Sequence, residues 1–124
     1  MRRATYRQPC AAHALNLAIG DIFNNPHSEF YIEQDIQYLV KHAPYGTYTK
    51  GYKPVLQTIR WISLYTCVHF IYTHANEYLN ARNQQVRIIY CKIDDIVKWE
   101  YLDKVLEIFR ELLSQIETDI DIND

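Results

Sequence analysis

The last third of the chain carries the pattern that most limits what it can fold into. Between residues 99 and 116, large apolar side chains recur at alternating intervals of three and four, namely at Trp99, Leu102, Leu106, Phe109, Leu113 and Ile116. This spacing places all six on one side of a helix, and we call them the Trp99 stripe. Val105, Ile108 and Leu112 widen it. Such a face requires a partner, either the rest of the chain or another protein.

The rest of the chain adds further helical patterns. A helix is predicted from residue 10 to Phe23, because Pro9 suits a helix start and residues 24–26, Asn-Asn-Pro, stop it. A second amphipathic run covers 32–41. A third, from about 55 to 81, is long enough for two helices with a bend near residues 60–63. Asp94 and Asp95 are expected at the start of the final helix, where negative charge complements the helix dipole.

Three segments depart from the helical pattern. Residues 86–93, VRIIYCKI, are rich in β-branched and aromatic side chains, which is typical of a short strand. Residues 43–53 contain two glycines and few aliphatic side chains and are expected to form a loop with partly exposed tyrosines. The acidic residues 118–124 are expected to be a disordered tail. Together these patterns predict an all-α fold with at most one short strand, in a single domain over residues 1–117.

Composition agrees with a soluble globular domain. The chain has 124 residues, of which 48% are hydrophobic and 23% are charged, and it contains no apolar run long enough to span a membrane. Its three cysteines, Cys10, Cys67 and Cys91, are an odd number and far apart. They are therefore expected to be buried thiols in a reducing compartment, the nucleus or the cytoplasm. Because the net charge is −2, any contact with a phosphate backbone should be local.

The segment CAAHALNLAIGD, residues 10–21, raises the question of catalysis. A cysteine at a helix N-terminus has its thiolate favoured by free backbone N–H groups, which is the setting of papain-like and Josephin-like cysteine proteases. His13 stands three residues from Cys10 on the same helix, which leaves no room for a substrate between them. The other candidate bases are His42, His69 and His74, and none of them follows a strand-like segment. A protease with Cys10 as its nucleophile is therefore an alternative interpretation.

Cys10 and His13 also have the spacing of half a zinc site. The other half would come from Cys67, His69, His74 or Cys91. His69 and His74 would lie roughly 140° apart on one helix, since successive residues turn by about 100°. No metal site is therefore expected, and we predict that Cys10 packs while His13 makes a hydrogen bond.

A second segment, RWISLY, places Arg60 beside Trp61. A guanidinium next to a large aromatic surface is suited to holding a phosphate and stacking an unpaired base. A surface arginine beside a buried indole is the simpler alternative.

In combination, these segments resemble motifs of the hAT family of DNA transposases. CAAHALNLAIGD resembles the family's CxAHxLNL segment, with matches at Cys10, His13, Leu15, Asn16, Leu17 and Asp21. RWISLY resembles its Arg-Trp motif, with Arg60, Trp61 and Ser63 matching and Ile62 departing. KWEYLDKVLEIF resembles its Trp-centred helix, with matches at Trp99, Leu102, Ile108 and Phe109, whereas Lys98 replaces the usual acid. The three motifs follow the family order over residues 10–117.

The resemblance implies an edge of an RNase H-like core followed by the first part of a helical insertion domain. In hAT transposases two catalytic aspartates precede the Cys-His segment and the catalytic glutamate follows the Trp-centred helix; a BED zinc finger and a C-terminal dimerisation segment complete the enzyme. None of the acids in this chain stands at those catalytic positions. We therefore expect no enzymatic activity and no cofactor.

The resemblance also implies roles for individual residues. Arg60, Trp61 and Ser63 would contact a transposon DNA end, weakly in isolation. Cys10, His13, Asn16, Asp21 and Trp99 would be structural. Partners would be DNA and other transposase domains, or a second copy bound through the helix from Trp99 to Ile116. A helical protein-interaction module remains a further alternative.

Overall fold

The computed structural model describes residues 7–47 and 61–123 of the chain, with side chains for residue 11, residues 13–47 and residues 63–116. Every regular element in these ranges is a helix, which confirms the all-α class. The six helices are α1 (Arg7–Phe23), α2 (Glu33–Lys41), α3 (Trp61–Thr73), α4 (Ala75–Leu79), α5 (Gln84–Ile96) and α6 (Trp99–Asn123).

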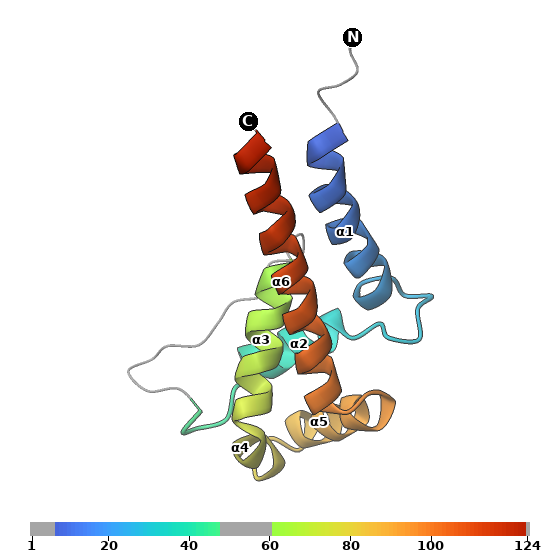
Figure 1. The fold of residues 1–124 in the computed structure, drawn as a ribbon. Coiled ribbons are helices and arrows are strands. Elements are labelled where there is room, and N and C mark those ends of the chain that lie inside the picture. Colours follow the sequence, from blue (N-terminus) through green and yellow to red (C-terminus); the bar gives the residue numbers. More distant parts are fainter. Residues whose placement is uncertain (1–6, 48–60, 124) are drawn as a thin grey trace.

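Helix α6 is the long axis of the fold, and α1 and α3 pack along it (Figure 1). Helix α2 crosses behind α3 and α6 in this view, α5 lies at the end of the group where α6 begins, and the short α4 connects α3 to α5. The first turns of α1 and the last turns of α6 extend beyond the other helices at the opposite end. None of the described helices is long and apolar enough to cross a membrane.

The Trp99 stripe finds its partner inside the chain. Trp99, Leu102 and Leu106 are buried in a core to which the other long helices also contribute. Phe109 and Leu113 are partly buried against that core. The three residues predicted to widen the stripe, Val105, Ile108 and Leu112, remain exposed.

The segment 86–93 is helical, so the strand prediction is wrong. It lies within α5, whose buried residues Val86, Ile89, Tyr90 and Ile93 follow a helical spacing. The side chain of Asn83 caps this helix by accepting hydrogen bonds from the backbone N–H groups of Gln85, at 2.9 Å, and Val86, at 3.4 Å. A cap and one buried helical face outweigh the local preference of β-branched residues for strands.

The long helical run is interrupted between α3 and α4, whereas the bend expected near residues 60–63 borders residues outside the described range. Trp61 to Ser63 are already helical, and the interruption falls at His74, between α3 and α4. The expected helix before residue 61 lies outside the described residues. The His74 N–H donates to the Ile71 carbonyl, and the His74 carbonyl accepts from Tyr78. This local pattern turns the chain toward α5.

Two further boundaries differ from the predictions. Asp94 and Asp95 belong to the last turn of α5, whereas α6 begins at Trp99. Asp94 still interacts with the start of α6, because its Oδ1 accepts a hydrogen bond from the Trp99 backbone N–H at 3.2 Å. At the other end α6 continues to Asn123, beyond residue 117, where the helical domain was expected to end. Extending an existing helix costs far less than starting one.

The prediction of buried cysteines is confirmed only for Cys67, which is fully buried on α3. Cys91 is exposed, because it lies about 150° around α5 from the centre of the face that holds Val86, Ile89, Tyr90 and Ile93. The side chain of Cys10 lies outside the described residues. In the predicted loop, Tyr45 is fully exposed, and residues 48–53 are outside the described range.

Candidate functional site

The Arg-Trp motif lies at the start of α3. Arg60 is outside the described residues, and Trp61 is the first described residue of α3. Ser63 is half-buried and has a polar partner within the structure.

The Cys-His segment forms the first half of α1. His13 and Asp21 are exposed, whereas Asn16 is half-buried and has a polar partner. The buried face of α1 is formed further along, by Ile19 and Phe23. His13 lies about 120° around the helix from Ile19, away from this buried face, and its expected hydrogen bond stays a prediction.

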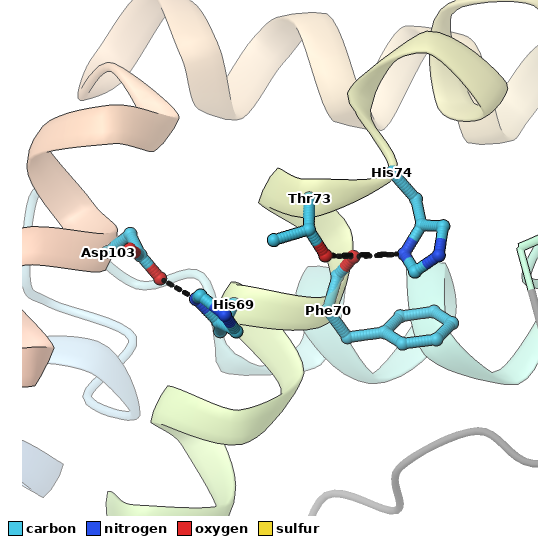
Figure 2. Close-up of polar contacts among 5 residues, drawn as sticks. All are labelled: His69, Phe70, Thr73, His74 and Asp103. Atoms are coloured by element: carbon cyan, nitrogen blue, oxygen red, sulfur yellow. Dashed lines mark hydrogen bonds and ion pairs between the residues drawn. The ribbon is translucent and has the colours of Figure 1, made fainter.

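The structure brings together a polar cluster that the sequence did not reveal as a unit. His69 on α3 donates from Nδ1 to Oδ1 of Asp103 on α6 at 2.9 Å (Figure 2). The Asp103 side chain is nearly buried, with 11% exposed, whereas that of His69 is 51% exposed. Tyr65 stacks on the His69 ring with centroids 5.6 Å apart, and the Arg110 guanidinium lies 5.3 Å from the Tyr65 ring. Burial, followed by the charge of Asp103, raises the pKa of the Tyr65 phenol.

Asp103 is the residue from which this cluster could have been predicted in the sequence. It directly follows Leu102, a buried member of the Trp99 stripe, and a buried carboxylate needs a donor. The geometry holds the imidazole in one orientation, with Nδ1 occupied and the remaining ring nitrogen, Nε2, free of this bond. An oriented imidazole is a component of acid–base sites.

This cluster lacks the thiol that a cysteine protease would need. Cys67 lies two residues from His69 on α3, but its side chain is buried on the other side of the helix. Burial raises the pKa of its thiol to about 12, which makes it a poor nucleophile. Cys91 is on the outward face of α5, and Cys10 lies in the opening turns of α1. The protease interpretation therefore gains no support from the described side chains.

His69 and His74 have separate partners, so they do not converge. Whereas His69 faces α6, the Nδ1–H of His74 donates to the carbonyl of Phe70 at 2.8 Å (Figure 2). The Thr73 hydroxyl donates to the same carbonyl at 3.1 Å. Within the described part of the chain, no three side chains of His, Cys, Asp or Glu lie together as a metal site would require.

Trp99 serves as an anchor of the fold. Its side chain is only 2% exposed, and its Nε1–H donates to the Tyr90 carbonyl at 3.1 Å. Tyr90 stacks between Trp99 and Tyr78, with ring centroids 5.2 and 5.9 Å apart respectively. These aromatic contacts join α4, α5 and α6, and they leave no surface of the indole for a ligand.

An open groove of about 620 Å³ lies between the end of α2 and the α4–α5 turn, lined by His42, Tyr45, Glu77 and Arg82 among others. Two of its amides are already engaged. Asn80 donates to the Asn76 carbonyl, and Asn83 caps α5 and donates to the Tyr38 hydroxyl. None of the sequence-predicted site residues lines this groove.

No protein-family model, curated protein or solved structure matches this chain.

Proposed function

We propose that this chain is a shortened hAT-like transposase unit that contacts a DNA end through Arg60 and Trp61 and otherwise serves as a scaffold. The proposal assigns the chain to the edge of an RNase H-like core and the first part of a helical insertion domain. It acts in cut-and-paste DNA transposition or in a process derived from it, inside the nucleus.

The observation that carries the proposal is the combination of three ordered motifs. Cys10 to Asp21, Arg60 to Ser63, and the helix from Trp99 are widely separated in sequence. The helices that hold the described residues of these motifs, α1, α3 and α6, pack against one another in pairs. One packed unit is what a transposase segment with these motifs would need, because the Arg-Trp pair must be held on a rigid support to receive a base.

The scaffold role follows from the placement of the acids. Cleavage of a phosphodiester by paired metals requires carboxylates that converge. Asp21 is exposed on α1, and the Asp103 carboxylate is committed to His69. Under the proposal the chain therefore binds DNA without cutting it.

A direct test is binding to DNA hairpins with an unpaired end, measured by fluorescence anisotropy at low salt. We expect weak binding that favours the unpaired end over a fully paired duplex, since stacking on an exposed base contributes about 1–3 kcal/mol. Trp61→Ala should remove this preference. Arg60→Ala should weaken binding to both DNAs and reduce the salt dependence by about one phosphate contact.

Matched controls are Tyr45→Ala, which removes a fully exposed aromatic ring, and Arg82→Ala, which removes an exposed arginine at the α4–α5 turn. Both variants should bind as the parent chain does. Equal loss in the control variants, or binding that ignores the unpaired end, would refute a specific role for Arg60 and Trp61.

A further inference from the structure

The exposed side of α6 carries a second row of apolar residues. Tyr101, Val105, Ile108 and Leu112 have 63%, 41%, 58% and 44% of their surface exposed, respectively. We call these four residues the outer stripe. At about 100° per residue, its centre lies roughly 100° around α6 from the centre of the Trp99 stripe. Helix α6 therefore uses one face for its own core and presents another to solvent.

The spacing of the outer stripe is that of a helix-pairing seam. The intervals are four, three and four residues, which is the a/d pattern of a coiled coil. They are also symmetric about the point between Leu106 and Glu107. A symmetric row of this kind is complementary to itself when a second helix runs in the opposite direction.

We propose that the outer stripe binds a second copy of this chain, with the two α6 helices antiparallel. In this arrangement Val105 faces Ile108 of the second copy, and Tyr101 faces its Leu112. The two-fold axis passes between Leu106 and Glu107. The inference concerns α6 alone and does not depend on DNA binding by Arg60 and Trp61.

The charges beside the outer stripe favour the same arrangement. Lys104 and Glu111 occupy equivalent flanking positions, seven residues apart, on the side away from the Trp99 stripe. In an antiparallel pair these positions lie across from each other. Lys104 of each copy therefore faces Glu111 of the other copy, which gives two symmetric ion pairs. Within its own chain Glu111 makes an exposed contact with Arg110 at 3.5 Å.

A parallel pair would not match in this way. Lys104 and Glu111 would then face the positions five residues further along on the other flank of the seam, which are Phe109 and Ile116. Both are apolar, and Phe109 is packed against its own core. The parallel arrangement therefore offers these charges no partner.

The size of the contact sets its expected strength. Residues 101–112 span about 18 Å of helix, and a single helix pair of that length buries less than the roughly 800 Å² per partner of a standard interface. We therefore expect a reversible dimer that depends on concentration.

Sedimentation velocity of the full chain, from about 10 μM to about 1 mM, tests the proposal. The weight-average mass should rise from 14.8 kDa toward twice that value. Ile108→Asp should weaken association at least about tenfold, since a charge would be buried in the seam. The control Ile88→Asp places the same charge at an isoleucine of α5 that is 50% exposed, and it should leave association unchanged. Far-ultraviolet circular dichroism checks that both variants fold.

Charge exchange tests the antiparallel orientation. Lys104→Glu and Glu111→Lys should each weaken self-association several-fold, because like charges then face each other. An equimolar mixture of the two variants should associate at least as well as the parent chain, since opposite charges again meet. A chain that stays monomeric throughout, or a mixture no better than either variant alone, would overturn the proposal.

Discussion

The indole Nε1–H of Trp99 donates a hydrogen bond to the carbonyl oxygen of Tyr90 at 3.1 Å. This bond spans the short link between α5 and α6. The same indole stacks on the Tyr90 ring, which in turn stacks on Tyr78. The Tyr78 hydroxyl donates to the Leu39 carbonyl at 2.7 Å, so one aromatic stack joins α2, α4, α5 and α6.

Trp99 should therefore be among the most sensitive positions in the chain. We expect Trp99→Phe to lower the free energy of unfolding by about 1–2 kcal/mol, because the hydrogen bond to Tyr90 is lost while most apolar contact is kept. Trp99→Ala should cost about 3–5 kcal/mol by opening a cavity. Urea denaturation measures both losses. Tyr45→Ala, at a fully exposed ring, should change stability by less than about 0.5 kcal/mol.

The pair formed by His69 and Asp103 should contribute a measurable coupling between α3 and α6. A double-mutant cycle with His69→Ala and Asp103→Asn should give about 0.5–1 kcal/mol, since one partner is half exposed. The same cycle on Lys98 and Asp94, an exposed pair at 3.5 Å, should give less. Equal coupling free energies in the two cycles would show that the burial of Asp103 does not strengthen its interaction with His69.

The thiols should differ sharply in reactivity. In a Cys10→Ser background near pH 8, a disulfide reagent should label exposed Cys91 within minutes while Cys67 stays protected. Cys67 is fully buried and burial raises its pKa to about 12, so it should react only as the chain opens. Adding denaturant should release this second thiol along with the loss of helical circular dichroism. Rapid labelling of two thiols in the folded chain would contradict the packing of α3.

Glu33 should make stability depend on pH. It is buried at the start of α2, and this burial raises its pKa above the usual 4.5. Between about 4.5 and the higher folded value, the folded chain keeps a proton that the unfolded chain has lost. The contribution of Glu33 to the free energy of unfolding therefore falls as pH rises through that window.

The variant Glu33→Gln removes this titration. The free energy of unfolding of the variant minus that of the parent chain should increase by about 1 kcal/mol from pH 4 to pH 7. The reason is that the parent must bury a charged carboxylate at pH 7, and burying a polar group without a good partner typically costs about that much. Thermal unfolding at the two pH values measures the change. Gln34→Glu, at an exposed neighbouring position, gives the behaviour of a solvated carboxylate on the same helix. A stability difference that does not change with pH would contradict the burial of Glu33.

The sequence located α1, α2 and the apolar face of α6 correctly because their patterns depend on local periodicity. It could not place residues 86–93, where β-branched composition and helical spacing coincide and only the Asn83 cap and the neighbouring helices decide between them. The burial of Glu33 could not be predicted from the sequence either, because a polar side chain gives no local signal that neighbouring helices will cover it.

For the candidate site, the sequence by itself led to the proposal that Arg60 and Trp61 contact a DNA end, and it supplied the segments that resemble transposase motifs. Only the tertiary structure decided that Asp103 contacts His69, and that one apolar face of α6 is buried in the core while the other is exposed to solvent. Helical periodicity tells which side chains share a face, because the backbone repeat is fixed. Which of those faces is covered depends on how distant helices pack, and that is a property of the whole chain.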